Sequence, residues 1–132
     1  MSYLIDTNIA SAFIRGNRPI GQKFFQYGGL LTLSTVSRGE LLTWAYRKRT
    51  APRIRQGIIE SLALFQQVPV DLEIADQFAM LHAELLDGGQ PHSTFDLLIA
   101  ATAMVHDLTV VTHNTVDFVR VPGLRVVDWH VE

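Results

Sequence analysis

Four carboxylates in this chain of 132 residues stand at positions from which they can act together. Each one comes shortly after a predicted strand or opens a predicted helix: Asp6, Glu40, Asp96 and Asp117. Carboxylates within a few ångströms of one another repel strongly unless a cation lies among them. Oxygen-only ligands select hard ions, so the chemistry that these residue types support is the binding of Mg²⁺ or Mn²⁺.

Each acid also has a purely structural interpretation. Asp6 can be a helix N-cap, which accepts a hydrogen bond from a backbone N–H of the first turn. The segments Ser37–Glu40 and Ser93–Asp96 fit a capping box, and Asn114–Asp117 fits the same pattern more loosely. Taken singly, the cap is the commoner role for each acid. A shared metal site is favoured only if the fold gathers all four.

The elements that would gather them are short β-branched strands alternating with helices. We predict strands at Tyr3–Ile5, Leu30–Leu33, Val68–Val70, Thr109–Thr112 and Leu124–Val127. We predict helices at Ile9–Ile14, Ile20–Gln26, Val36–Arg49, Pro52–Gln66, from the cap Asp71 to Leu86, and at Thr94–His106, with a turn at His113–Asp117. This alternation favours a three-layer α/β fold, in which a central parallel sheet of four to five short strands is flanked by helices.

A parallel sheet would bring the acids to one edge. The carboxyl ends of parallel strands lie side by side, and sites form just beyond them. Asp6, Glu40 and Asp117 would therefore meet, and Asp96 would join them if its helix starts at the same edge. Mg²⁺ held by a few carboxylates keeps open positions for a phosphate, which is typical of a phosphoryl-transfer or nuclease site.

Composition narrows the class of protein. The length suits a single domain over residues 1–132, and the absence of cysteine excludes disulfides and, with no His-x-x-x-His pair, argues against zinc. The net charge of −2 does not indicate a nucleic-acid binder, so such binding needs a local patch or a metal. Asp6 interrupts the apolar N-terminal segment, so we expect neither a signal peptide nor a membrane span there. We therefore expect a cytoplasmic protein.

Further polar residues stand beside the acids at the predicted strand ends: Thr7, Asn8, Thr112 and Asn114. They can form caps and turns, or they can orient the carboxylates from a second layer. None of the five histidines is assigned to catalysis, and His113 is the nearest candidate.

A basic cluster follows the second acidic segment: Arg47, Lys48, Arg49, Arg53 and Arg55. It can be a solvated helix end and helix start. It can also be a contact surface for an RNA backbone or for an acidic segment of a protein partner.

Four segments, taken in order, resemble one known family. Y-L-I-D-T-N-I, L-S-T-V-S-R-G-E-L, F-D-L-L-I-A-A-T-A and T-V-V-T-H-N-T-V-D-F are similar to the successive motifs of PIN-domain ribonucleases, in particular the VapC toxins of bacterial toxin–antitoxin pairs. No single segment is specific, but the ordered set covers nearly the whole chain.

The resemblance implies a PIN fold, Mg²⁺- or Mn²⁺-dependent endoribonuclease activity, a homodimer, and neutralisation by a small antitoxin protein. It carries Asp6, Glu40 and Asp96 over as metal-site acids. At the fourth position some family members have an acid where Asn114 stands, and others have it three residues later. We favour Asp117, with Asn114 as an auxiliary ligand.

Two other readings are kept open. One is another Mg²⁺-dependent phosphoryl-transfer domain, such as a receiver or a phosphatase. A receiver would need adjacent acids after the first strand and a late lysine, and a phosphatase of the haloacid type would need an acid at Asn8. The other is a PIN-fold binding module that has lost catalysis, although all four acids are present.

Overall fold

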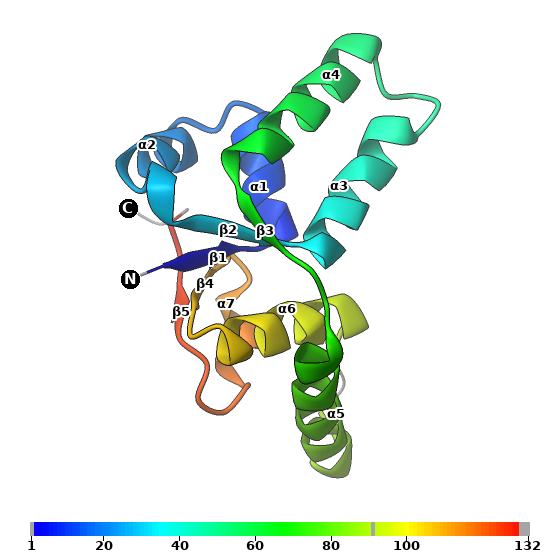
Figure 1. The fold of residues 1–132 in the computed structure, drawn as a ribbon, viewed down its shortest axis with the longest axis vertical. Coiled ribbons are helices and arrows are strands. Elements are labelled where there is room, and N and C mark those ends of the chain that lie inside the picture. Colours follow the sequence, from blue (N-terminus) through cyan, green and yellow to red (C-terminus); the bar gives the residue numbers. More distant parts are fainter. Residues whose placement is uncertain (1, 91, 130–132) are drawn as a thin grey trace.

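A single five-stranded parallel sheet forms the centre of the protein. The computed structural model describes residues 2–90 and 92–129. Its strands are β1 (Tyr3–Ile5), β2 (Leu31–Ser34), β3 (Gln66–Val68), β4 (Thr109–Val111) and β5 (Val126–Val127). They lie in the order β3-β2-β1-β4-β5, and every neighbouring pair is parallel. The predicted α/β fold is confirmed (Figure 1).

Helices cover both faces of this sheet (Figure 1). One layer consists of α1 (Thr7–Ile14), α2 (Arg18–Gln26), α3 (Thr35–Tyr46) and α4 (Pro52–Ser61). The opposite layer consists of α5 (Leu72–Asp87), α6 (Thr94–Val105) and α7 (Thr115–Val119). Two 3₁₀ turns, Gly28–Leu30 and Leu62–Leu64, connect to the strands β2 and β3. No helix among residues 2–90 and 92–129 is both long enough and apolar enough to cross a membrane.

Neighbouring residues of the central strands point into two separate cores. Ile5 and Val111 belong to the core under α1–α4, whereas Leu4 and Val110 belong to the core under α5–α7. Successive side chains of a strand point to opposite faces, so a strand buried on both sides has to be apolar at every position. This explains the continuous apolar runs at the two strands in the middle of the sheet.

The predicted end of the third helix is wrong. α3 stops at Tyr46, and Arg47 is already extended with ψ of 143°. Thr50 Oγ1 donates to the carbonyl of Trp44 at 2.6 Å, so a side chain satisfies a carbonyl that a longer helix would have bonded. The basic run 47–49 therefore lies in a loop, not in the last turn of a helix.

The predicted strand at Val68–Val70 is displaced by two residues. β3 is Gln66–Val68, because Gln66 and Val68 pair in register with Thr32 and Ser34 of β2. Pro69 has no N–H to continue the ladder. The helix before it consequently ends at Ser61 and not at Gln66. The predicted turn after β4 contains the start of the short helix α7.

Candidate metal and active site

Asp6 is the most buried of the four acids. It follows β1 directly and caps α1, where its Oδ1 accepts the N–H of Ile9 at 2.8 Å. Its side chain is 5% exposed. Burial raises the pKa of Asp6 to about 6, and the charges of Asp96 and Glu40 push it in the same direction, whereas the hydrogen bonds from Thr112 and Ile9 lower it. The local cap was predictable, but the burial was not.

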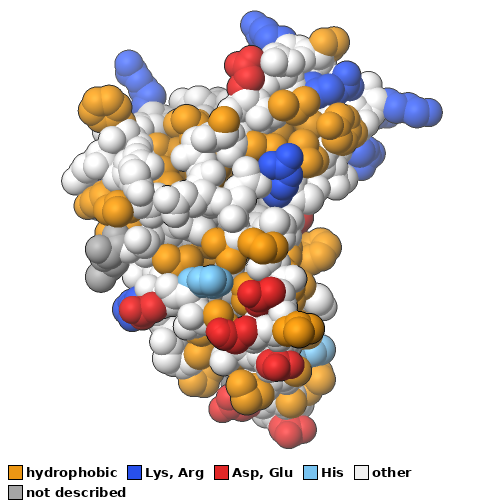
Figure 2. Space-filling view, viewed as in Figure 1, with side chains coloured by type: hydrophobic (Ala, Val, Ile, Leu, Met, Phe, Trp, Pro, Cys, Tyr) orange, Lys and Arg blue, Asp and Glu red, His pale blue; other side chains and the backbone are white. Residues whose placement is uncertain are grey.

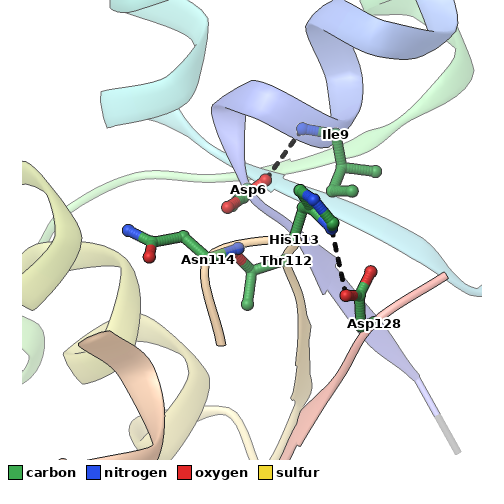
Figure 3. A network of polar contacts seen from close by, with 6 residues as sticks. All are labelled: Asp6, Ile9, Thr112, His113, Asn114 and Asp128. Atoms are coloured by element: carbon green, nitrogen blue, oxygen red, sulfur yellow. Dashed lines mark hydrogen bonds and ion pairs between the residues drawn. The ribbon is translucent and has the colours of Figure 1, made fainter. Parts of the chain in front are cut away.

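The segment that follows β4 lies beside Asp6 (Figure 3). The hydroxyl of Thr112 forms a hydrogen bond with Asp6 and also accepts the N–H of Asn114 at 3.0 Å. Asn114 Nδ2 donates to Asp117 Oδ2 at 2.7 Å and makes no side-chain cap bond to α7. The side chain of Asn114 thus binds Asp117 and not a backbone N–H of α7. The capping pattern predicted for this segment is therefore wrong in its hydrogen bonds, although Asn114 does stand at the N-cap position.

Glu40 lies on α3, the helix that follows β2 on the other side of β1. Thr7 Oγ1 donates to Glu40 Oε1 at 2.5 Å, and a second hydrogen bond of 2.9 Å joins Thr7 Oγ1 to Ser37 Oγ. The capping box predicted for Ser37–Glu40 is wrong, because Ser34 is the N-cap of α3. Glu40 lies in the second turn of α3, where no backbone N–H needs it, and its carboxylate is held by α1.

Asp96 lies in the first turn of α6, as predicted. Ser93 is the N-cap and its Oγ accepts the N–H of Asp96 at 3.4 Å. Burial raises the pKa of Asp96, the charges of Asp117 and Glu40 raise it further, and His92 lowers it. The carboxylate of Asp96 is therefore close enough to Asp117 and Glu40 for their charges to affect its pKa, although all three are distant in the sequence.

The acids are near enough for their charges to shift one another's pKa, but their oxygens are not positioned as a complete set of metal ligands. Among residues 2–90 and 92–129, no three His, Asp or Glu side chains are arranged to hold a metal ion as they stand. Mg²⁺ needs only one or two direct carboxylates and keeps several waters. Carboxylates that raise the pKa of Asp6 and Asp96, in a donor set of oxygen atoms, fit a hard cation of this kind.

Sequence reasoning missed three contacts around this edge. Ser37 contacts Thr7, and His92 Nε2 lies 3.1 Å from the carbonyl oxygen of Asp117. His113 Nδ1 lies 3.1 Å from Asp128 Oδ2, which brings the end of β5 to the end of β4 (Figure 3). Nothing local in the sequence announces these pairs, because each joins segments that meet only in the folded chain.

Among the described residues, neither Asn8 nor the arginines of α4 has a hydrogen bond to one of the four acids. Asn8 is exposed in the first turn of α1. Arg53 is exposed on α4, whereas Arg55 is partly buried and its Nε donates to the carbonyl of Ala45 at 2.8 Å, so Arg55 has a structural contact. Figure 2 shows Lys and Arg side chains gathered over the end of the molecule formed by α3 and α4, with several Asp and Glu side chains in the other half.

Comparison with known proteins adds to this geometry. The model of the PIN domain family matches residues 3–124. The chain belongs to the PIN-domain family. Membership was predicted from the four ordered motifs and is confirmed.

Relatives of this PIN domain match it from end to end. The tRNA(fMet)-specific endonuclease VapC of Shigella flexneri is 33% identical over 132 residues, covering 98% of each chain. Ribonuclease VapC1 of Rickettsia felis is 33% identical over 129 residues, covering 96% of this chain and 95% of its own. A solved structure described as DNA-bound VapBC from Salmonella typhimurium superimposes with a TM-score of 0.90 at 28% identity, covering 98% of both chains.

Membership of the PIN-domain family supports the binding of a divalent cation at the acidic edge. PIN-domain nucleases generally depend on a divalent metal ion. The oxygen-only acidic edge of this PIN domain has the ligand types that such an ion prefers.

Proposed function

We propose that this chain is a metal-dependent endoribonuclease that hydrolyses RNA phosphodiester bonds and acts as the toxin of a toxin–antitoxin pair. The observation that carries the proposal is the convergence of Asp6, Glu40, Asp96 and Asp117 at one edge of a PIN fold, where burial and mutual repulsion raise the pKa of two of them. Full-length similarity to proteins named as VapC ribonucleases supports it. One PIN domain spans the chain in this proposal.

Each acid has a proposed role in holding Mg²⁺, for which Mn²⁺ substitutes. Asp6 and Asp96 anchor the ion, because burial disfavours the charge of both carboxylates and a bound cation would compensate it. Glu40 and Asp117 complete the site directly or through water, with Asn114 as an auxiliary ligand. Thr7 donates a hydrogen bond to Glu40, and Asn114 donates one to Asp117, so each of these two carboxylates is already oriented by a neighbour.

The chain's own residues orient the reaction. Thr112 and the N–H of Ile9 fix the carboxylate of Asp6, which stands at the start of a helix. When bound, the ion polarises the scissile phosphate and makes a water more acidic. Hydrolysis of the bond between phosphorus and the 3′ oxygen would balance with one water, whose oxygen would go to phosphorus and one of whose protons would go to the leaving 3′ oxygen. Thr7 keeps Glu40 oriented toward α1 throughout.

The proposed partners follow from the relatives. A solved relative is described as a VapBC complex. We therefore expect this chain to bind a small cognate antitoxin that covers the acidic edge, to form a homodimer, and to act in the cytoplasm.

RNA cleavage by the purified chain tests the proposal. Total bacterial RNA incubated with the chain and Mg²⁺ should acquire new ends at defined positions, and RNA-end sequencing should map them. EDTA should abolish the cleavage and Mn²⁺ should restore it. RNA that stays intact with either ion, while the chain remains folded by circular dichroism, would contradict the proposal and favour a PIN-fold binding module.

A further inference from the structure

A large hollow lies at the end of α1 that is farther from the acids. It has a volume of about 730 Å³, and its lining includes Arg15, Trp44, Arg47, Arg49 and Ile54. We call it the Trp44 hollow. The guanidinium carbon of Arg15 lies 4.4 Å from the centre of the Trp44 ring, so a planar cation covers the aromatic side chain. Arginine planes and aromatic rings are the groups on which unpaired RNA bases stack.

A second hollow adjoins it and shares two of its arginines. It has a volume of about 370 Å³ and is lined by Tyr46, Arg47, Lys48 and Arg49. We call it the Tyr46 hollow. The side chain of Tyr46 is 65% exposed, which is unusual for a large aromatic residue without a partner. Each hollow therefore combines one aromatic side chain with the same pair of cations.

The cations of the run 47–49 form no ion pair among the described residues, whereas Arg15 is engaged with Trp44 and with Ser11. The ion pairs of the described residues are His113–Asp128 and Arg125–Asp107, and neither involves the run 47–49. These three consecutive charges stand in a loop beyond α3. Like charges held side by side without acidic partners favour an anionic ligand.

The position of the hollows suits a strand that also reaches the acids. α1 carries Asp6 at its N-terminal cap and Arg15 at its C-terminal cap. At a rise of about 1.5 Å per residue the two caps are roughly 13 Å apart along the helix. A single strand of a few nucleotides spans such a distance.

We propose that the Trp44 and Tyr46 hollows bind two successive nucleotides of single-stranded RNA, with the bases against Trp44 and Tyr46 and the intervening phosphate at Arg47 and Arg49. The proposal rests on the proposed nuclease function, because RNA is the substrate in both. Aromatic rings that alternate with shared cations are what single-stranded nucleic acids require, since stacking accepts any base and the cations follow the backbone. An acidic protein segment would use the cations, but its carboxylates would not be attracted to the negative faces of the two aromatic rings.

The test is binding of a fluorescein-labelled single-stranded RNA, measured by anisotropy in EDTA so that no cleavage occurs. The double variant R47Q/R49Q should bind RNA more weakly than the parent. Its slope of log affinity against log salt should be shallower by roughly 0.7 for each phosphate contact that is lost. The matched control is R18Q/K23Q, which removes the same charge from two positions of α2 outside both hollows and outside the basic cluster.

Stacking is tested at Tyr46, because its exposed side chain can be replaced without disturbing the core. Y46A should weaken binding about 5- to 150-fold, whereas Y46F should bind as the parent does. An RNA with abasic sites should bind the parent more weakly than intact RNA, and Y46A should reduce this difference. That reduction would separate base stacking from general attraction to charge.

Three outcomes decide the proposal. Equal RNA affinity and equal salt slope for R47Q/R49Q and R18Q/K23Q would overturn it. A poly-glutamate peptide that loses affinity for R47Q/R49Q, while RNA affinity stays unchanged, would also overturn it and assign the hollows to an acidic protein. RNA that binds through these residues but is not cut by the parent with Mg²⁺ would uphold the binding site and contradict only the nuclease proposal.

Discussion

Two charged regions of this molecule lie at opposite ends of α1 and differ in the sign of their charge, in burial and in hydrogen bonding. The acidic edge, formed by Asp6, Glu40, Asp96 and Asp117, is partly or fully buried, and neighbouring side chains hold Glu40 and Asp117. The basic run 47–49 is exposed in a loop. Charge that the fold buries lowers stability unless a ligand compensates it, whereas exposed charge has little effect on folding. The comparison indicates that both regions serve ligands, by different means.

The largest expected effect is on catalysis at the acidic edge. Asp96→Asn should reduce RNA cleavage about 10³-fold, since a metal supplies several kcal/mol of transition-state stabilisation and each 1.36 kcal/mol is a factor of about ten. The fold should persist, because Asn keeps the shape and the cap of α6 is Ser93. Asp76→Asn, at an exposed position of α5, is the control and should cut at the parent rate. Equal cleavage by both variants would remove Asp96 from the site.

The next effect is on stability. The pKa of Asp6 in the folded protein, about 6, lies above its ordinary value of 3.8. The folded state therefore binds this proton more tightly, so the contribution of Asp6 to stability is largest below about pH 4 and is lost as the pH rises through about 6. Asp6→Asn, which still caps a helix, should raise the free energy of unfolding in EDTA at pH 8 by up to about 3 kcal/mol.

Urea unfolding against pH measures this gain, which should vanish below about pH 4. Asp71 provides the matched control, because it caps α5 in the same way, accepting the N–H of Ile74 at 3.0 Å, but is exposed. Asp71→Asn should change stability by less than about 0.5 kcal/mol. A pH-independent effect of Asp6→Asn would show that buried charge is not what distinguishes the two caps.

A smaller effect is expected where one element orients an acid of another. Thr7→Val removes the hydroxyl that donates to Glu40 and should lower the cleavage rate about 10- to 100-fold. Thr7→Ser keeps the hydroxyl and should restore most of the rate. Comparing single-turnover rates at saturating Mg²⁺ separates this orientation effect from weaker metal binding. Equal rates for the Val and Ser variants would leave the Thr7–Glu40 bond without a role in catalysis.

The smallest effect is expected at the basic run. R47Q/R49Q should change the free energy of unfolding by less than about 0.5 kcal/mol per site, because both side chains are exposed and have no acidic partner among the described residues. Thermal unfolding checks this. A loss of several kcal/mol would mean that the two arginines stabilise the fold, and the contrast with the acidic edge would fail.

The features that depend on local sequence were predictable. The strand at Tyr3–Ile5 and the caps Asp6, Asp71 and Ser93 were read correctly, since each is decided by a few adjacent residues. What could not be predicted depends on packing between distant segments. The capping box offered as the structural interpretation of Glu40 does not form, because Glu40 contacts Thr7 of another helix.

Boundaries failed for the same reason. The third strand is set by its register against β2 and not by its own apolar residues, which is why Val68–Val70 was a misleading signal. The end of α3 is set by Thr50, which folds back onto the carbonyl of Trp44. Both contacts follow from the folded chain rather than from the propensity of the segment.

Binding of Mn²⁺ by the acidic edge is the most direct test of the central claim. Calorimetric titration of the folded chain with Mn²⁺ should show saturable binding that is lost in Asp6→Asn and in Asp96→Asn, and retained in Asp71→Asn. Binding should weaken as the pH falls through about 6, because protons then compete with the ion for Asp6. Equal affinity in all four proteins would contradict the claim that these acids gather around one cation.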